Sequence, residues 1–310
     1  MMSNCPKISV IIPCINSENT IQKTFDSLKM QNYENLECIV IDGGSSDKTL
    51  HIIEKNRDIV DIFISEKDSG APDAQNKGIK LATGDLIGFL HSDDYYVSSM
   101  LHEVCKAYLD YKDFDLITYG IEIESLQSKK TIMSSCSKKN LDLNLNNILF
   151  KHAMGHFYKK ENFIKNGFLK TKSKNGGVMY ANDREFLIKL CLLGKKNHVV
   201  EKILYKMGAH KDSNTLSRNN IVAIRYEHID IANVYMNLYR DSIYKFNKLK
   251  EFKAHNLSLL FTYYVLTLSA KKAFGVFRDG YKLKKFSWFF CLILCPLREF
   301  LYRASVKKWL

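Results

Sequence analysis

Short apolar runs alternate with helical segments through the first hundred residues, and this alternation constrains the fold most. Apolar residues of strand-like character, rich in valine and isoleucine, occupy residues 7–13, 36–42, 60–65 and 86–90. Helical spacing of apolar residues follows each run, beginning near Ile21, Leu50, Ala71 and Met100. Such alternation predicts an α/β fold with a mostly parallel sheet and helices on both of its faces.

Polar residues stand where the predicted strands end. They are Asn16 after the first strand, Asp42 after the second, Glu66 and Asp68 after the third, and Asp93 and Asp94 after the fourth. The carboxyl ends of parallel strands share one edge of a sheet, which is where α/β proteins bind ligands. We therefore expect one binding site built from four loops.

The fourth of these loops carries the sequence His91-Ser-Asp-Asp94, directly after an apolar strand. Adjacent carboxylates repel each other, and a divalent cation relieves that repulsion. Oxygen ligands suit Mg²⁺ or Mn²⁺, which keep coordination positions open for substrate phosphates. We expect a metal site at Asp93, with His91 and Asp94 as further ligands. A solvated Asp-Asp turn is the alternative, and Asp94 can instead cap the next helix.

Composition and charge narrow the class of protein. The chain has 310 residues, of which 46% are hydrophobic and 25% charged, as in globular proteins. Its formal net charge of +13 favours anionic partners such as nucleotides or phospholipid surfaces. Residues 271–310 hold ten basic and two acidic residues, hence +8 of that charge. Nucleic-acid enzymes place basic residues around the catalytic cleft, so this distribution argues against a nucleic-acid partner.

The second half of the chain alternates less regularly. We expect a hairpin from residues 116–123 and 130–133, a strand at 155–159, a helix from Asn182 to Leu193, an extended run at 197–204 and a long helix at 219–244. The predicted catalytic domain spans residues 1–215, with a nucleotide-sugar-binding half at 1–112 and an acceptor half at 113–215. Residues 216–310 form a helical, basic C-terminal appendage.

Two uncharged stretches, residues 256–270 and 286–297, lie in this C-terminal region. Each is shorter than the ~20 residues that a membrane-spanning helix needs. Flanking basic and aromatic residues are typical of helices that lie on an anionic membrane surface. The alternative is that both stretches pack on the protein core.

Eight cysteines are present, without any CxxC pair. Cys14 and Cys38 fall in or beside predicted strands, where a reduced cysteine packs as a small hydrophobic residue. Met1 to Lys7 leads directly into the first strand, so we expect no secretion signal. These features favour a reducing, cytoplasmic location.

The motifs resemble those of the family 2 inverting glycosyltransferases, which have the GT-A fold and include bacterial surface-polysaccharide and O-antigen enzymes. The resemblance covers the first hundred residues in order and spacing, with a fainter match at Ala181-Asn-Asp-Arg-Glu-Phe-Leu187. The matching segments are Ser9–Pro13 with Asn16, Ile39–Thr49, Ser65–Gly70, Asp73–Gly78, Ala82–Asp85 and Phe89–Asp94.

The resemblance implies a nucleotide-sugar donor, a divalent metal (Mn²⁺ or Mg²⁺) and specific roles for single residues. The implied donor-binding residues are Pro13, Asn16, Asp42, Asp68, Asn76 and Asp93, with Asp42 as the acceptor of a hydrogen bond from the base, usually uracil. Asp183 matches the catalytic base. Three residues depart from the family pattern: His91 replaces an aspartate, Gln75 replaces an arginine and Asn182 replaces a glutamate.

The chemistry of sugar transfer needs these residue types independently of the resemblance. The leaving nucleoside diphosphate develops negative charge that a divalent ion stabilises, and a carboxylate can deprotonate the acceptor hydroxyl. Structural alternatives exist for the single residues: Asp42 can cap the Gly43-Gly44 turn, and Asp183 can be only a helix N-cap. Lys77 can approach a phosphate, and His152 and His156 can lie near the acceptor.

We therefore expect a glycosyltransferase that moves a sugar from a UDP-sugar to a saccharide on a polyprenyl-diphosphate carrier, by metal-assisted single displacement. Its expected place is cytoplasmic, peripheral on the inner face of the cell membrane. Polyprenyl phosphate itself is the alternative acceptor, and a non-catalytic, membrane-associated sugar-nucleotide binder is the alternative function. Paired acids also suit glycoside hydrolases, but those enzymes need no nucleotide pocket.

Overall fold

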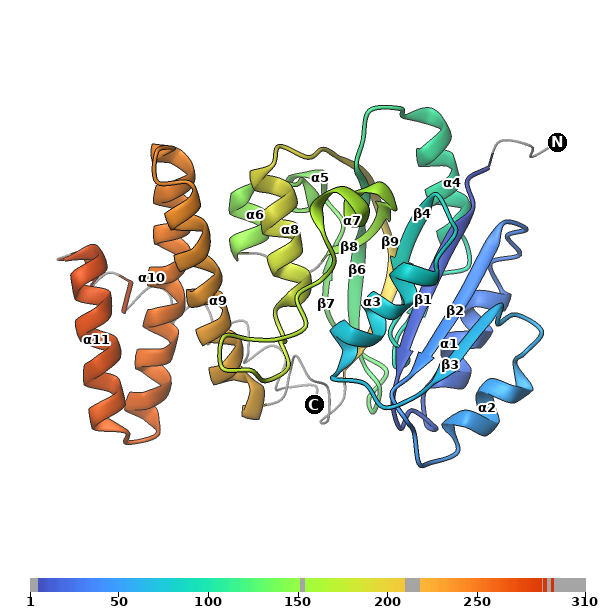
Figure 1. Ribbon diagram of the computed structural model, residues 1–310, viewed down its shortest axis with the longest axis horizontal. Coiled ribbons are helices and arrows are strands. Elements are labelled where there is room, and N and C mark those ends of the chain that lie inside the picture. The colour runs from blue at the N-terminus through green and yellow to red at the C-terminus, as the bar shows by residue number, and fades with distance from the viewer. Residues whose placement is uncertain (1–4, 151–153, 210–217, 286, 289–290, 293–310) are drawn as a thin grey trace.

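The computed structural model describes residues 5–150, 154–209, 218–285, 287–288 and 291–292 (Figure 1). The strands are β1 Ile8–Cys14, β2 Leu36–Asp42, β3 Ile62–Ser65, β4 Leu86–Phe89, β5 Tyr95–Tyr96, β6 Leu116–Ser125, β7 Thr131–Ser135, β8 Met154–Lys159 and β9 Asn197–Ala209. The helices are α1 Ile21–Lys29, α2 Thr49–Lys55, α3 Ala71–Leu81, α4 Met100–Asp110, α5 Lys138–Leu141, α6 Leu145–Phe150, α7 Glu161–Asn166, α8 Asn182–Leu192, α9 Arg218–Leu238, α10 Ile243–Leu266 and α11 Ala270–Lys284.

The predicted parallel sheet forms from the first four strands. β1 lies between β2 and β4, and β3 pairs with the outer side of β2, all in parallel. All seven residues of β1 are buried, as expected for a central strand that is covered on both faces. The four predicted strand ends therefore lie along one edge of the sheet.

Beyond β4 the sheet is mixed, so the expectation of a mostly parallel sheet holds only for its first four strands. β8 pairs antiparallel with both β4 and β6, β7 forms the predicted hairpin with β6, and β9 pairs parallel with β6 and antiparallel with β5. The short β6–β7 connection allows only antiparallel pairing. The described strands run in the order β3-β2-β1-β4-β8-β6-β9-β5.

Each face of the sheet has its own apolar core, because successive side chains of a strand point to opposite faces. Val10 and Ile12 pack with α1, α2 and α4 on one face. Ile11 packs on the other face with Ile39 and α3, in a core that also includes α6 and α8. The two layers of helices confirm the predicted α/β architecture.

The C-terminal helices extend the second core. α9 contributes Ile231, Ala232 and Tyr235 to it, and α10 contributes Leu249 and Phe252. Figure 1 shows α9, α10 and α11 side by side at one end of the molecule, remote from β3. The region is helical as predicted, but its first part is joined to the catalytic domain by a continuous core. The predicted boundary at residues 215 and 216 lies outside the described residues.

The long predicted helix at 219–244 is two helices. α9 ends at Leu238 and α10 begins at Ile243, because the turn at residues 239–242 reverses the chain. The uncharged stretch 256–270 has two parts: Asn256 to Leu260 is buried among the helices, whereas Leu266 and Leu268 are exposed. The other uncharged stretch, 286–297, lies mostly outside the described residues. None of the described helices is long and apolar enough to cross a membrane.

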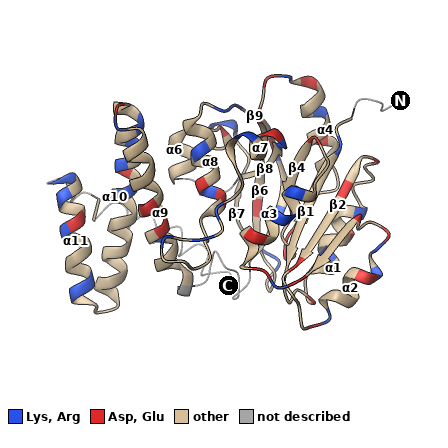
Figure 2. Ribbon diagram, viewed as in Figure 1, with Lys and Arg blue, Asp and Glu red and all other residues tan. Residues whose placement is uncertain are grey.

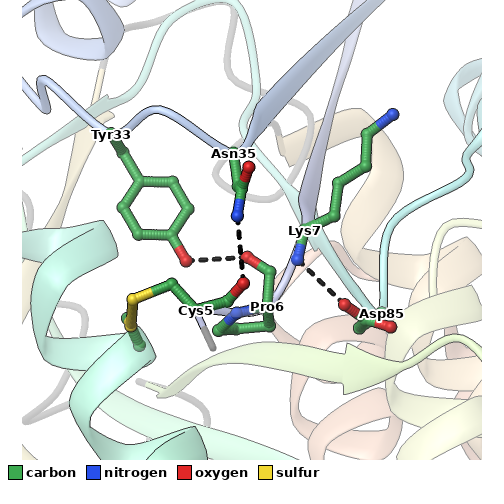
Figure 3. Close-up of a disulfide and its surroundings, with 7 residues drawn as sticks. Cys5, Pro6, Lys7, Tyr33, Asn35 and Asp85 are labelled. Atoms are coloured by element: carbon green, nitrogen blue, oxygen red, sulfur yellow. Dashed lines mark hydrogen bonds between the residues drawn. A yellow bond between two sulfur atoms is a disulfide. The ribbon is translucent and has the colours of Figure 1, made fainter. Parts of the chain in front are cut away.

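A disulfide joins Cys5 to Cys105 and so connects the segment before β1 to α4, with 5.8 Å between the two Cα atoms (Figure 3). The Tyr33 hydroxyl donates to the Pro6 carbonyl at 2.7 Å in the same region, and Asn35 donates to the Cys5 carbonyl. Cys14 and Cys38 are free and buried, as predicted, whereas the reducing setting that the sequence favoured does not fit this bonded pair. The cysteines therefore no longer favour a reducing compartment, since disulfides persist in oxidising ones.

Candidate active site

The loops after β1 and β2 are held together by Asn16. Its side-chain oxygen accepts from the backbone N–H of Ser46 at 2.9 Å, and its own backbone N–H donates to the Ser45 hydroxyl at 2.8 Å. Asn16 has a φ of +47°, a left-handed conformation that asparagine adopts more readily than most residues. Both loops are exposed here, so they present a shaped surface at the predicted edge.

A serine pair joins the loop after β1 to the loop after β4. The hydroxyl oxygens of Ser17 and Ser92 lie 2.7 Å apart, and the Ser17 backbone N–H donates to the Thr49 hydroxyl at 2.7 Å. Ser92 lies within the His91–Asp94 motif and is 8% exposed. The motif is thus fixed relative to the first two loops by short polar contacts.

Asp42 is fully buried, and its carboxylate belongs to the turn that follows β2. One carboxylate oxygen accepts from the backbone N–H groups of Gly44 and Ser45 at 3.0 and 2.9 Å, and from the Ser65 hydroxyl at 2.7 Å. The other accepts from the Ser45 hydroxyl and lies 3.7 Å from the Cys14 sulfur. These contacts match the alternative interpretation, in which Asp42 caps the Gly43-Gly44 turn. A hydrogen bond from a nucleotide base to Asp42 requires one of the serines to move.

Asp68, after β3, faces the loop after β2. Its carboxylate accepts from the Gly70 N–H at 2.8 Å. A Cβ atom on Gly43 would lie 2.9 Å from the other carboxylate oxygen of Asp68, so only glycine permits this approach. The half-buried Asp68 therefore lines the same edge as Asn16 and remains a predicted donor-binding residue.

Pro13 and Asn76 are buried and do not line the exposed edge of the sheet. Pro13 is buried within β1, opposite Ile41 of β2. Both polar atoms of the Asn76 side chain bond to the backbone of Leu169, at 2.8 and 3.0 Å. The buried Asn76 therefore connects α3 to Leu169, and its part in donor binding stays a prediction. Lys77 pairs with Glu66 at 2.8 Å, so its charge is already compensated.

Asp94 points into the protein, so the expectation that it ligates metal is wrong. It is 4% exposed; one carboxylate oxygen accepts from the Gly208 N–H at 2.8 Å and the other from the Tyr205 hydroxyl. Burial, and then the nearby charge of Asp93, raise the pKa of Asp94. Asp94 does not cap α4 either, because that helix begins at Met100.

The candidate metal ligands are reduced to Asp93 and His91. Among the described residues, no three His, Cys, Asp or Glu side chains converge as ligands for a metal ion. Asp93 is half-buried and His91 is exposed. Mg²⁺ and Mn²⁺ in phosphate-transfer sites take one or two carboxylates from the protein and the rest of their ligands from substrate and water. The donor set therefore fits an ion that arrives with a diphosphate, held by Asp93.

Asp183 is exposed in the first turn of α8, and one of its carboxylate oxygens accepts from the Arg184 N–H at 2.6 Å. The segment before α8 lies against the loop after β3, since a Cβ atom on Gly70 would meet Val178 at 2.7 Å. An exposed carboxylate near the loops of the sheet edge suits the role of a base, which stays a prediction.

Two departures from the family pattern contact each other. The side-chain amide of Asn182 donates to the side-chain oxygen of Gln75 at 3.0 Å, and both residues are buried. Gln75 belongs to α3 and Asn182 begins α8. This neutral hydrogen bond therefore fixes the residue next to Asp183 relative to the helix that follows the β3 loop.

Glu227 of α9 holds the same segment from the other side. Its carboxylate is 6% exposed and accepts from the backbone N–H groups of Tyr180 and Ala181, at 3.0 and 2.9 Å. Burial raises the pKa of Glu227, although these two hydrogen bonds oppose the shift. The C-terminal region thus positions the start of α8 and Asp183 with it.

Sequence reasoning missed Ser17, Ser92, Tyr205 and Glu227. Ser92 lies inside the His91–Asp94 motif that the sequence indicated, so its place in the site could have been predicted. Tyr205 and Glu227 come from β9 and α9, far along the chain, and no local pattern indicates their contacts. His156, named as a possible acceptor contact, is 8% exposed and its Nδ1 lies 3.0 Å from the Thr118 hydroxyl. His152 lies outside the described residues.

Residues 9–167, about half of the chain, match the family described as "Glycosyl transferase family 2". The chain belongs to this family. It is therefore a glycosyltransferase with the GT-A fold, and the matched range contains all four strand-end loops. The exposed Asp183 lies beyond the matched range.

Curated relatives extend the similarity over most of the chain. The poly(ribitol-phosphate) beta-N-acetylglucosaminyltransferase TarP of Staphylococcus aureus (strain N315) is 28% identical over 91% of this chain and 86% of its own length. The UDP-Glc:alpha-D-GlcNAc-diphosphoundecaprenol beta-1,3-glucosyltransferase WfaP of Escherichia coli is 27% identical over 88% of this chain and 97% of its own length.

Solved structures show the same fold. S. aureus TarS (residues 1–349, in complex with UDP-GlcNAc) has a TM-score of 0.67 at 20% identity, covering 96% of this chain and 88% of that one. The mannosyltransferase PcManGT of Pyrobaculum calidifontis, in complex with GDP-Man and Mn²⁺, has a TM-score of 0.59 at 13% identity, covering 98% and 83% of the two chains. These likenesses establish the fold across nearly the whole chain.

Proposed function

We propose that this protein is an inverting glycosyltransferase that moves a sugar from a UDP-sugar to a lipid-linked saccharide during surface-polysaccharide or O-antigen synthesis. The observation that carries the proposal is the position of Asp183. Its exposed carboxylate lies in the first turn of α8. The segment that precedes α8 packs on the loop after β3, where Val178 contacts Gly70. A carboxylate that can act as a general base therefore lies beside the edge where the four strand-end loops meet.

The chemistry follows from this placement. The Asp183 carboxylate takes the proton of the acceptor hydroxyl, whose oxygen attacks the anomeric carbon of the donor. The bond from that carbon to the diphosphate breaks on the opposite face, so the anomeric centre is inverted. The loops around Asn16 and Asp68 hold the nucleoside diphosphate. Asp93 would hold a divalent ion, which would compensate the negative charge of the leaving diphosphate.

The choice of donor and acceptor rests on the relatives. WfaP is named for a UDP-glucose donor and a diphosphoundecaprenol-linked acceptor, and the TarS structure contains UDP-GlcNAc. TarP is named for a poly(ribitol-phosphate) acceptor, which carries phosphate charges as well. The basic C-terminal region fits such acceptors, and we propose that the enzyme works peripherally on the inner face of the cell membrane.

The test is sugar transfer by wild-type enzyme and by the Asp183→Asn variant. Purified protein is incubated with radiolabelled UDP-glucose or UDP-GlcNAc, Mn²⁺ and membrane lipid extract, and labelled lipid is extracted. We expect transfer by the wild type and a loss of at least a hundredfold in Asp183→Asn, with its melting temperature unchanged. Equal transfer by both proteins would refute the assignment of the base.

A further panel tests the donor and the class of acceptor. GDP-mannose replaces the UDP-sugars in one arm, and transfer from it alone keeps the enzyme class but contradicts the UDP donor. Mild acid hydrolysis of the labelled lipid separates a monosaccharide on polyprenyl phosphate from an extended lipid-linked saccharide. Failure of the wild type to transfer any sugar, with nucleotide binding intact, would favour a non-catalytic binding protein.

A further inference from the structure

A groove of about 570 Å³ lies between α9 and α11, with α10 as its floor. α9 contributes Tyr226 and Asn233, and α10 contributes Lys253 and Leu257. α11 lines it with one face, since its groove residues recur at helical spacing: Lys272, Gly275, Val276, Asp279, Lys282 and Leu283. A groove of this volume is large enough for a small organic ligand.

Its polar groups are mainly hydrogen-bond donors. Three lysines, Lys253, Lys272 and Lys282, face one carboxylate, Asp279, which leaves the lining with a net charge of +2. Lysine ammonium groups only donate, so they favour an anionic partner. Figure 2 shows the blue bands of basic residues along α11.

Lys253 is the most informative of these groups. It is half-buried, and burial lowers its pKa, although Asp279 and Asp230 act against that shift. Neither aspartate lies within 4.0 Å of the Lys253 ammonium, and the residues described offer it no hydrogen bond. A half-buried charge without a close partner is costly, and an anion in the groove would compensate it.

The walls of the groove are apolar. Ile229, Leu257, Val276 and Leu283 line it between the charged groups. Beside its Lys272 end, apolar side chains are exposed on the end of α10 (Val265 and Leu266), in the turn that follows (Leu268, 92% exposed) and near the start of α11 (Phe274). Donors beside apolar walls and an exposed apolar turn match an amphiphile with an anionic head better than a free phosphate.

The groove and the segment before the candidate base are both in contact with α9. Tyr226 lines the groove, and the next residue, Glu227, bonds to the N–H groups of Tyr180 and Ala181 just before Asp183. A lipid head held here would lie against α9, the helix that also positions the start of α8 and Asp183. A phospholipid that merely anchors the protein needs no such shared helix.

We propose that this groove binds the diphosphate head and first isoprene units of the polyprenyl-diphosphate carrier that bears the acceptor saccharide. The lysines contact the diphosphate, the apolar walls contact the isoprene chain, and the exposed α10–α11 turn enters the membrane. This inference rests on the proposed function for the identity of the lipid, and it assigns that acceptor a site.

The test is binding to vesicles of phosphatidylcholine that contain undecaprenyl diphosphate, measured by co-sedimentation of the full chain. The groove variant carries Lys253→Gln, Lys272→Gln and Lys282→Gln. The matched control carries Lys271→Gln, Lys284→Gln and Lys285→Gln, which remove the same charge from positions outside the groove lining. We expect the groove variant to lose about tenfold or more in affinity and the control to lose less than threefold.

Two further arms make the test decisive. The groove and control variants should bind phosphatidylglycerol vesicles equally well. Excess inorganic pyrophosphate should compete only weakly with undecaprenyl diphosphate vesicles for the wild-type protein. Equal losses in the two variants on undecaprenyl diphosphate would overturn the proposal in favour of general electrostatic attraction. If Lys253→Gln lowers the melting temperature, the double variant of exposed Lys272 and Lys282 replaces the triple.

The binding assay needs no turnover, so its outcome is separate from that of the proposed function. Retained transfer in Asp183→Asn would remove the base assignment but leave lipid binding by the groove intact. If the groove and control variants bind undecaprenyl diphosphate equally while sugar transfer still depends on Asp183, the groove proposal is refuted and the proposed enzymatic function stands.

Discussion

The side-chain amide of Asn182 donates to the side-chain oxygen of Gln75 at 3.0 Å, across 107 positions of sequence. Both side chains are buried, and each stands where the family pattern has a charged residue. The pair connects α3, which follows the β3 loop, with the start of α8. It thereby fixes the residue next to Asp183 without burying an ion pair.

The first prediction concerns the coupling of this pair. Gln75→Ala leaves the Asn182 amide buried without its acceptor, which costs about 1–3 kcal/mol in free energy of unfolding. Asn182→Ala costs a similar amount, whereas the double variant loses less than the sum because the second change removes the orphaned group. Urea unfolding of the four proteins measures the coupling. Strictly additive losses would show that the hydrogen bond does not link the two elements.

The second prediction concerns Glu227. Glu227→Ala leaves the N–H groups of Tyr180 and Ala181 without their acceptor, and Asp183 loses its fixed position. We expect kcat to fall by roughly tenfold to a hundredfold with KM for the donor nearly unchanged, as for small misplacements of a catalytic group. Glu227→Gln keeps one acceptor oxygen and should recover most of kcat. A fall in donor affinity instead of kcat would place Glu227 in donor binding.

The third prediction concerns pH. Glu37 of β2 is 5% exposed, and burial alone would raise its pKa; ion pairing with Lys7 and hydrogen bonds from Ser9 and Thr83 instead hold that pKa at about 2. The folded-state pKa lies below the usual 4.5, so Glu37 stabilises the fold above pH 4.5 and this contribution is lost as pH falls towards 2.

Glu37→Gln tests this sign. The variant should lose stability at pH 7 by about 1–3 kcal/mol, because a hydrogen-bonded buried charge is removed. Its remaining stability should then change less between pH 5 and about pH 2 than that of the wild type. Glu54→Gln is the control, since the Glu54 side chain is 61% exposed. The same acid sensitivity in the wild type and Glu37→Gln would contradict the assignment.

The fourth prediction concerns the disulfide. Cys5 and Cys105 close a loop of about a hundred residues, for which cross-linking typically contributes roughly 2–4 kcal/mol by restricting the unfolded chain. Reduction should therefore lower the melting temperature. Sugar transfer at 25 °C should stay within about twofold, because Cys5 precedes β1 and the site lies at the carboxyl end of that strand. Loss of transfer on reduction without unfolding would contradict this separation.

Sequence patterns predicted the local features well. The β-branched run that became β1 is buried on both faces of the sheet. The helix predicted from Asn182 to Leu193 ends at Leu192, and Gly194, with a φ of +74°, follows its C-cap. Both depend on neighbouring residues only. The prediction of one long helix at 219–244 was wrong at its end, because the turn at residues 239–242 contains no glycine or proline and α10 packs back against α9.

Contacts between distant residues were beyond sequence reasoning. Asp93 and Asp94 are chemically identical neighbours, yet Asp94 faces Tyr205 and Gly208 of β9, whose approach no local pattern indicates. Asp42 is likewise a residue that could contact a nucleotide, but its carboxylate accepts hydrogen bonds from the backbone of the turn that follows β2. The motif showed where the site lies, and the packing of β9 decided which carboxylate can reach it.

Thermal stabilisation by UDP with and without Mn²⁺ tests the central claim most directly, in the wild type, Asp93→Asn and Asp94→Asn. Specific ligands raise the melting temperature of the folded state that binds them. We expect UDP with Mn²⁺ to raise it in the wild type and in Asp94→Asn, whose amide can keep the bonds to Gly208 and Tyr205, and the Mn²⁺-dependent part to vanish in Asp93→Asn. No rise in the wild type, or an equal rise in Asp93→Asn, would contradict the nucleotide-sugar site described above.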